Sequence, residues 1–445
     1  MRPMSKTKWT TAFLVLVCSL VAVLPYFQFS PTFASVDGHA DYVSTDTREG
    51  RLAVFDNVWE TIDERYYDPH FAGIDWNAPR TMFRQAAADA RGSYELYEVL
   101  RRMVSSLRDP HTRVYSPEEK FDWWNPRFVS MGLTIREIEG VPTVVQVDPK
   151  SDPARAGIRA GDQLESIDGV SASYLVEQRI GASQSLLHSN RSEGVRAVAT
   201  LLEGVAGSST KLGWKGRAGK VKVATFRRFW NQRELGFRIS QEEHKYLVIE
   251  LEAFTQSLVL ELMRALKDKL GNARGVVLDL RNNGGGDAAA MAEFAAIFLG
   301  QGVSLGSFTN RAGESFQLNT HAKSIFSASW TSPTRLPLVV LMSERTSSAA
   351  EILAAVLQAQ GRARLVGAAT CGCVLAIRSR HTLPDDGVLD VSEFDYQTAD
   401  GIRLEGRGVQ PEDLIQHERR DLYSKRDRAR QRAREMLNED GRQLR

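Results

Sequence analysis

The sequence has little cysteine and almost no net charge. Three cysteines occur among 445 residues, so disulfides cannot provide the framework of the fold and a large hydrophobic core must do so. Lys and Arg total 57 against 55 for Asp and Glu, which leaves no basic field for nucleic acid. With 42% hydrophobic and 25% charged residues, the composition is that of a globular protein, neither disordered nor multispanning. The length predicts two or three domains.

The N-terminus has the parts of a secretory signal. Basic residues precede a short apolar run, 12–24, and small residues occupy the recognition positions before a cut after Ala34. We therefore expect residues 1–34 to be a signal peptide and the protein to be exported to a periplasmic or other extracytoplasmic space. The alternative is an uncleaved membrane anchor over residues 9–29.

Residues 35–127 are predicted to form a helical N-terminal lobe. Apolar residues recur at helical spacing through Val54, Val58 and Ile62, and again over 94–107. The pattern then breaks at Asp109-Pro110-His111-Thr112, because the residue before a proline disfavours helix.

From about residue 129 the pattern changes to short alternating strands separated by turn residues, with a short helix near 151–158. The run 128–228 resembles a PDZ domain. That resemblance implies that a polypeptide with a free C-terminus adds as an extra strand along the segment Gly132, Leu133, Thr134 and Ile135. Another small β-rich domain is the alternative.

Strands and helices alternate over residues 229–420. Apolar strands are expected at 246–251, 275–280 and 336–342, with helices at 258–270, 288–299 and 347–360. This alternation predicts an α/β core with buried parallel strands. The charged tail, 421–445, is interpreted as a solvated terminal helix.

Two predicted turns from strand to helix carry residues suited to chemistry. The first contains three glycines, 284–286, and backbone N–H groups there could stabilise an oxyanion or cradle a phosphate. The sequence lacks both G-x-G-x-x-G and a following Lys-Ser/Thr pair, which disfavours phosphate. The second contains Ser348, which is either a helix N-cap or a nucleophile.

The order of these motifs resembles the C-terminal processing (tail-specific) protease family, peptidase family S41, along residues 50–415. The shared stretches are Asp-Leu-Arg-Asn-Asn-Gly-Gly-Gly at 279–286, Ser-Ala-x-Glu-Ile beginning at Ser348, and the glycine-bounded segment 361–367. The resemblance implies a crotonase-like ββα-spiral core with an inserted PDZ domain. It also implies Ser348 as nucleophile, with Gly284, Gly285 and Ala349 as oxyanion donors.

One position departs from the family pattern. Those proteases use a lysine after Phe-Gly as general base, but Cys373 stands at the matching position. The related tricorn-type proteases use a histidine, oriented by a glutamate in Glu-x-x-Gly-Val-x-Pro. Here His111 occupies the corresponding turn and Glu405 begins Glu-Gly-Arg-Gly-Val-Gln-Pro, which predicts a Ser348, His111, Glu405 triad. Alternatively, His111 is structural and Glu405 is a surface carboxylate.

Other residues provide rival assignments. His381 is a second candidate base, although its polar neighbours favour a strand position facing solvent. Cys371 and Cys373 could supply half a zinc site, a disulfide or an unusual nucleophile, and buried small residues are the favoured interpretation.

The sequence thus predicts an exported, PDZ-containing serine endopeptidase that cleaves unfolded or tagged proteins near their C-termini through an acyl-enzyme. This chemistry requires no metal and no organic cofactor. The partners are polypeptides with free C-termini, and nucleic acid is not among them. A catalytically silent peptide-binding scaffold and a crotonase-type thioester hydrolase or lyase are the alternatives.

Overall fold

The computed structural model describes residues 42–119, 127–181, 190–232, 234–242, 246–321 and 334–443. The predicted signal peptide lies outside these ranges. Within them, every helix is too short or too polar to cross a membrane.

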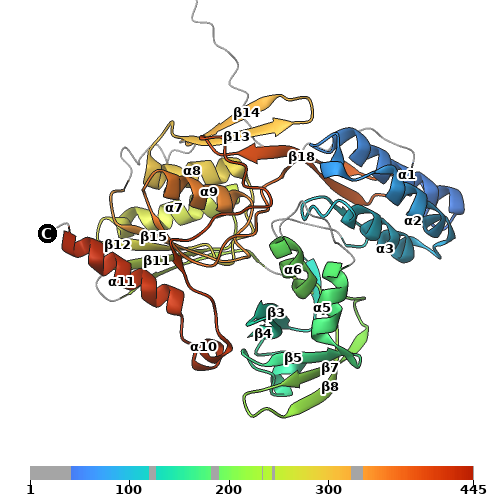
Figure 1. The fold of residues 1–445 in the computed structure, drawn as a ribbon, viewed down its shortest axis with the longest axis horizontal. Coiled ribbons are helices and arrows are strands. Elements are labelled where there is room, and N and C mark those ends of the chain that lie inside the picture. Colours follow the sequence, from blue (N-terminus) through green and yellow to red (C-terminus); the bar gives the residue numbers. More distant parts are fainter. Residues whose placement is uncertain are drawn as a thin grey trace, which may run out of the picture.

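The helical lobe consists of α1 (Arg48–Arg65), α2 (Asn77–Asp89) and α3 (Ser93–Ser105), drawn in blue in Figure 1. Thr47 begins α1 by accepting the Gly50 N–H at 3.0 Å, the N-cap role for which threonine is suited. The apolar stripe expected from the sequence, including Val54, Val58 and Ile62, is fully buried in the core of this lobe. A short 3-10 turn, η1 (Phe71–Gly73), connects α1 to α2.

A small domain follows, built on an antiparallel sheet in the order β3-β4-β5-β7-β8, with β6 paired to β5. Its strands are β3 (Leu133–Ile138), β4 (Val141–Val147), β5 (Gln163–Ile167), β6 (Val170–Ser171), β7 (Ser209–Lys215) and β8 (Val221–Arg227). Its helices are α4 (Asp152–Arg155), α5 (Ala172–Gly181) and α6 (Asn190–Ala199). Because β3 lies at the sheet edge, one of its sides has no strand partner among the described residues.

A separate ribbon joins the small domain to the rest of the chain. Strand β2 (Arg127–Ser130) precedes the domain, and it pairs antiparallel with β9 (Phe229–Gln232), which follows it. The chain therefore enters and leaves the small domain at the same place, as expected for an inserted unit.

The core sheet has the order β10-β11-β12-β15-β16-β19. Its strands are β10 (Phe237–Gln241), β11 (Tyr246–Leu251), β12 (Gly275–Asp279), β15 (Leu338–Met342), β16 (Arg364–Gly367) and β19 (Asp413–Leu414). The pairs from β11 to β19 are parallel, which confirms the predicted parallel α/β core. Helices α7 (Gln256–Leu270), α8 (Ala288–Leu299) and α9 (Ala349–Ala359) pack in one hydrophobic cluster against one face.

The charged tail packs on the opposite face of the core sheet. It forms α10 (Arg419–Ser424) and α11 (Arg428–Gln443), and Figure 1 shows α11 in red beside β11 and β12. Ala429, Ala433, Met436 and Leu437 are buried against strand residues such as Val339. The prediction of a solvated helix was wrong. These four residues form an apolar stripe at helical spacing, which the many arginines between them obscure in the sequence.

A third sheet connects the core to the helical lobe. It contains β13 (Ser304–Asn310), β14 (Ser315–Asn319), β17 (Ala376–Thr382), β18 (Val388–Gln397) and β1 (Arg113–Tyr115). Strand β18 is long enough to pair with β13 near one end and with β1 at the other. Since β1 follows the Asp109-Pro110-His111 turn directly, this pairing brings the turn from the lobe to the core (Figure 1).

Candidate active site

The two predicted turns from strand to helix meet at the carboxyl edge of the core sheet. Strands β12 and β15 are parallel neighbours, so the glycine turn (280–287) and the serine turn (343–348) start side by side. Thr346 Oγ1 donates to Leu280 O at 2.8 Å, and Ser347 N–H donates to Asn283 O at 3.1 Å. These bonds hold the two turns together as one unit.

Ser348 begins helix α9 in a strained backbone conformation. Its φ of 54° lies in the left-handed region, which a serine occupies only when surrounding contacts enforce it. Its N–H donates to Cys373 O at 2.8 Å and to Glu351 Oε2 at 3.2 Å. Ser348 is the N-cap residue of α9, as one of the two alternatives expected, and its positive φ is also of the kind found at functional residues.

Gly285 packs directly against Ser348. Its φ is 93°, and a Cβ at this position would lie 2.6 Å from Ser348 Cβ and 3.1 Å from Ala349 N. Only glycine allows so close an approach. The Gly285 N–H donates to Asn283 Oδ1 at 2.8 Å, so this expected oxyanion donor is already engaged. Ala349, the first residue of α9, presents its N–H at the helix start.

A disulfide lies beside the serine turn. Cys371 and Cys373 are joined across Gly372, and both are buried. We call the segment 371–373 the disulfide loop. The expectation of two unlinked buried residues was right about burial and wrong about pairing. Disulfide formation consumes both thiols, which removes the zinc and nucleophile alternatives for this state.

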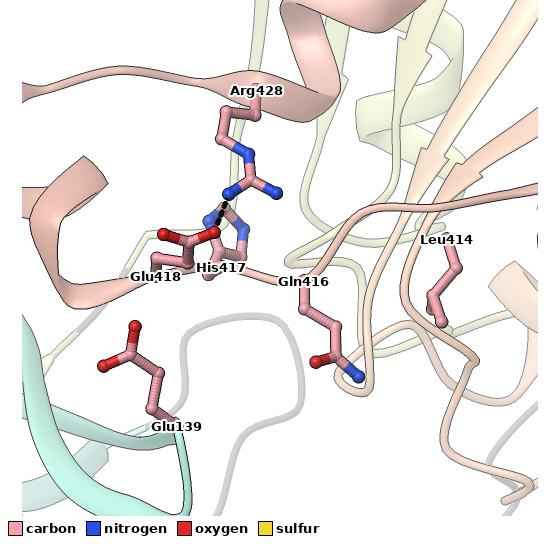
Figure 2. A pocket seen from close by; sticks show the side chains of 6 residues that line it. All are labelled: Glu139, Leu414, Gln416, His417, Glu418 and Arg428. Atoms are coloured by element: carbon pink, nitrogen blue, oxygen red, sulfur yellow. Dashed lines mark hydrogen bonds and ion pairs between the residues drawn. The ribbon is translucent and has the colours of Figure 1, made fainter.

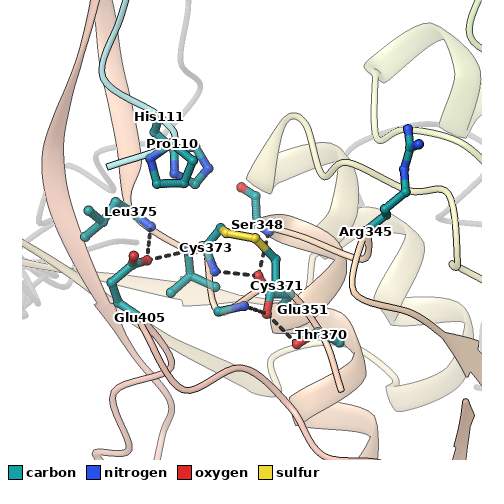
Figure 3. Close-up of a disulfide and its surroundings, with 12 residues drawn as sticks. Pro110, His111, Arg345, Ser348, Glu351, Thr370, Cys371, Cys373, Leu375 and Glu405 are labelled. Atoms are coloured by element: carbon teal, nitrogen blue, oxygen red, sulfur yellow. Dashed lines mark hydrogen bonds between the residues drawn. A yellow bond between two sulfur atoms is a disulfide. The ribbon is translucent and has the colours of Figure 1, made fainter. Parts of the chain in front are cut away.

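Glu351 connects the disulfide loop to the serine turn. Its fully buried carboxylate accepts the N–H groups of Gly372 at 2.7 Å and Cys373 at 2.9 Å, together with the Thr370 hydroxyl and the Ser348 N–H. Burial raises the pKa of Glu351, and these hydrogen bonds oppose that rise. These bonds fix the disulfide loop and Ser348 relative to each other (Figure 3).

His111 is held in its turn by Asp109. The Asp109 carboxylate, 1% exposed, accepts the N–H groups of His111 at 2.8 Å and Thr112 at 3.2 Å, and also the Thr112 hydroxyl. Burial alone would raise the pKa of Asp109, but His111 and the hydrogen bonds of the turn lower it to about 2. Asp109 is therefore ionised at neutral pH.

Glu405 is buried, so the alternative of a surface carboxylate is wrong. Its Oε2 accepts the N–H groups of Val374 at 2.7 Å and Leu375 at 3.2 Å, immediately after the disulfide loop. Burial, together with the charges of Asp109 and Glu351, raises the pKa of Glu405 to about 8, although the Val374 N–H opposes the rise.

The structure brings the three predicted triad residues to one region. Figure 3 shows Ser348, His111 and Glu405 around the disulfide. Within the described part of the chain, no hydrogen bond links any two of them. Ser348 N–H instead donates to the carbonyl of Cys373, the last residue of the disulfide loop, and Glu405 accepts the N–H groups of the next two residues, Val374 and Leu375.

Comparisons with known proteins decide the family. The model of peptidase family S41 matches residues 245–415, and that of the tricorn protease C1 domain matches 48–105. A carboxyl-terminal-processing protease of Picosynechococcus sp. is 30% identical over 90% of this chain and 89% of its own length. This chain belongs to the carboxyl-terminal-processing protease family. It is a serine peptidase of family S41.

Further relatives agree with this assignment. The chloroplastic carboxyl-terminal-processing peptidase 1 of Arabidopsis thaliana is 27% identical over 88% of this chain and 79% of its own. The photosystem II D1 C-terminal processing protease is 24% identical, with a TM-score of 0.52 over 82% of this chain and 93% of its own. Mature CPAF is 13% identical, with a TM-score of 0.65 over 88% of this chain and 96% of its own. These two structures support the mixed α/β fold alone.

His381 does not face solvent in this protease. Its side chain is 16% exposed, and its Nε2 lies 3.2 Å from Glu393 Oε1, a pairing between strands β17 and β18. The expected position facing solvent was wrong, because the alternating pattern of β17 does not reveal the partner on β18.

The small domain touches both turns of the candidate site. Arg136, on edge strand β3, donates to Asn282 Oδ1 in the glycine turn and lies 3.8 Å from Glu344 in the serine turn. Its side chain is 15% exposed. A side chain on the edge strand therefore contacts both the glycine turn and the serine turn.

A pocket of about 340 Å³ lies away from these turns, between the small domain and the C-terminal segment (Figure 2). Its lining residues are Glu139, Leu414, Gln416, His417, Glu418 and Arg428. None of them belongs to the serine turn, the glycine turn or the disulfide loop, so the pocket lies apart from the candidate active site.

Glu405 makes the stability of the protease depend on pH. Its pKa of about 8 exceeds the ordinary 4.5, so the stability from its protonated form is complete below about pH 4.5 and lost as pH rises towards 8. We expect the urea midpoint of Glu405→Gln to fall less between about pH 5 and pH 8 than that of the unaltered protein. Other titrating groups are common to both proteins, and parallel curves would contradict a buried, neutral Glu405.

Proposed function

We propose that this chain is an exported, PDZ-containing serine endopeptidase that cleaves unfolded or tagged proteins near their C-termini. The observation that carries the proposal is Ser348, held in a left-handed conformation at the start of α9 with Gly285 packed against it. A strained serine beside a glycine turn provides a nucleophile and N–H donors at the same place, as acyl transfer requires.

In the proposed mechanism His111 takes the proton from Ser348 Oγ, and Ser348 attacks a peptide carbonyl. The Ala349 N–H and the glycine turn at Gly284 and Gly285 stabilise the oxyanion. The Gly285 donor becomes available when its bond to Asn283 opens. His111 then protonates the leaving amine, and water releases the acyl-enzyme. The tricorn-like sequence motif would assign the third role, orientation of the imidazole, to a carboxylate at Glu405, and the steps need no metal or organic cofactor.

The small domain would act as the PDZ module that selects the substrate. Its edge strand β3 has room for an added strand, and helix α6 packs against β3, so a peptide could bind between them. Gly132, just before β3, has a φ of 87°, and a Cβ there would lie 2.5 Å from Ser151 Cβ. A peptide bound along Leu133, Thr134 and Ile135 would lie beside Arg136. The Arg136 side chain in turn contacts both the glycine turn and the serine turn.

Export is supported by the signal-like N-terminus and by the disulfide. Structural disulfides persist mainly in oxidising compartments outside the cytoplasm. The Cys371–Cys373 bond thus agrees with an extracytoplasmic location, and the fate of residues 1–34 decides whether the protein is also attached to a membrane.

The test is proteolysis of one unstructured polypeptide, made with a free apolar C-terminus and with an amidated C-terminus. We expect cleavage of the free form to be faster by at least about tenfold, because a PDZ site binds the terminal carboxylate. A Ser348→Ala sample prepared identically shows whether the cleavage comes from this site. Equal rates would contradict the selection of free C-termini, and binding without cleavage would favour the silent scaffold.

A further inference from the structure

The imidazole of His111 has an unpaired nitrogen. Its Nδ1 is buried and makes no hydrogen bond, although the side chain is 16% exposed overall. The carboxylate oxygen paired with this nitrogen is Asp109 Oδ1, at 3.7 Å. Glu405 directs its Oε2 to the Val374 and Leu375 N–H groups instead. A buried, unpartnered ring nitrogen facing a carboxylate is an incomplete pair of the kind found in a general base before substrate binds.

We propose that Asp109 is the positioning residue that orients the His111 imidazole, and that Glu405 instead anchors the chain after the disulfide loop. The inference rests on the proposed function, in which His111 is the general base. It changes which carboxylate supports the base.

Asp109 is suited to this role by its charge. When His111 accepts the Ser348 proton at Nε2, the ring becomes positive and its Nδ1–H faces Asp109. Closing the 3.7 Å separation by about an ångström would form a charge-assisted hydrogen bond. The proton on Nδ1 stays on the ring, and Asp109 remains ionised throughout. Glu405, neutral at pH 7 with a pKa of about 8, could not supply that charge.

Asp109 is also suited by its rigidity. The bonds from His111 N–H and from Thr112 fix its carboxylate, and Thr112 Oγ1 in turn accepts the Ser392 N–H of β18 at 3.1 Å. A supporting group must be held within a fraction of an ångström to orient a catalytic one. The turn is thus fixed to the sheet that connects lobe and core.

Other ionisable groups face this pair and contribute to any pH dependence. They lie on the end of α1, on β1, on α6, on β18 and in the segment after β18, and they are Tyr66, Tyr67, Arg113, Arg196, Asp390 and Glu405. Each variant below changes one residue and keeps all the other ionisable groups. A difference in pH dependence between two variants is therefore due to the residues replaced.

The experiment compares Asp109→Asn with Glu405→Gln in the full chain. Two rates are followed against pH: kcat/KM for an unstructured polypeptide, and covalent labelling of Ser348 by a fluorophosphonate. We expect Asp109→Asn to lower kcat/KM by about 10²- to 10⁴-fold. The acid limb of the pH–rate profile of Asp109→Asn should shift to lower pH, because a neutral amide at residue 109 no longer favours the protonated imidazole. Glu405→Gln should keep the acid limb and lose less than about tenfold.

Asp385→Asn is the matched control for loss of a buried carboxylate. Asp385 is 4% exposed and accepts the Tyr97 hydroxyl and the Gly387 N–H, so it too forms a turn outside the serine and glycine turns. Its replacement should lower the urea midpoint without moving the acid limb. A shift of the limb in Asp109→Asn alone therefore separates positioning of the base from general loss of stability.

Three outcomes would overturn the inference. The first is an acid limb in Asp109→Asn that coincides with that of the unaltered protein. The second is a shifted limb and the larger loss in Glu405→Gln. The third, which does not depend on any variant folding, is ¹⁵N NMR of the histidine-labelled protein showing that neutral His111 carries its proton on Nε2. By contrast, labelling and cleavage that persist in Ser348→Ala would reject the proposed function itself, whichever carboxylate faces the ring.

Discussion

Replacing Ser348 with alanine is expected to lower kcat/KM by about 10⁵- to 10⁶-fold, because the acyl-enzyme then cannot form. The strained φ of 54°, the adjacent Gly285 and the bond from Ser348 N–H to Cys373 O place this hydroxyl at the junction of the two turns. Alanine keeps the backbone bonds, so the variant should fold and still bind substrate. Turnover with an unstructured polypeptide and binding of the same polypeptide by fluorescence anisotropy measure the two properties separately.

The neighbouring Ser347 provides the control for this substitution. It belongs to the same turn, and its N–H donates to Asn283 O, yet its own backbone does not start α9. Ser347→Ala should keep at least about a tenth of the activity. A loss of kcat/KM as large as that of Ser348→Ala is expected only when the replaced group itself reacts. The reverse ranking of the two variants would show that Ser348 is not the nucleophile.

Much of the core was predictable because its periodicity is unambiguous. Strand β15 is buried at all five positions, and such an apolar run bounded by turns indicates a buried parallel strand. Helix α11 was misread because its apolar stripe, at Ala429, Ala433, Met436 and Leu437, is outnumbered by arginines. The density of charged residues suggested a helix exposed to solvent, whereas the spacing of four apolar residues determines which side of α11 is buried.

The site was predictable only at the level of its turns. The sequence places Ser348 and the glycines directly after two predicted strands. The parallel pairing of those strands brings the two turns to the same edge of the sheet. It does not reveal that Glu405 would bond to Val374 and Leu375, since those partners are fixed by the three-dimensional path of the disulfide loop. The one available signal for Asp109 was its place two residues before His111, the spacing at which an aspartate accepts a backbone N–H.

By its resemblance to the family pattern, the disulfide loop stands where a lysine-bearing segment is expected, and Glu351 binds this loop to Ser348. Four hydrogen bonds converge on its fully buried carboxylate, from Ser348, Thr370, Gly372 and Cys373. Their donors belong to the start of α9, to the residue before the disulfide loop and to the loop itself. One side chain therefore holds both the backbone of Ser348 and the disulfide loop.

Replacing Glu351 with alanine should consequently lower the free energy of unfolding by about 3 to 5 kcal/mol, because several buried donors lose their acceptor at once. kcat/KM should fall by at least about 10²-fold, since a shift of about an ångström at the nucleophile is enough for such a loss. Urea unfolding and turnover measure the two effects. The control is Glu412→Ala, because the exposed Glu412 carboxylate also accepts two hydrogen bonds, from Leu365 N–H and Gln358 Nε2, at a place outside the serine turn. Its loss should cost about 1 to 2 kcal/mol and leave turnover within a few-fold. Equal effects of the two substitutions would show that Glu351 stabilises the core generally and does not set the geometry of Ser348.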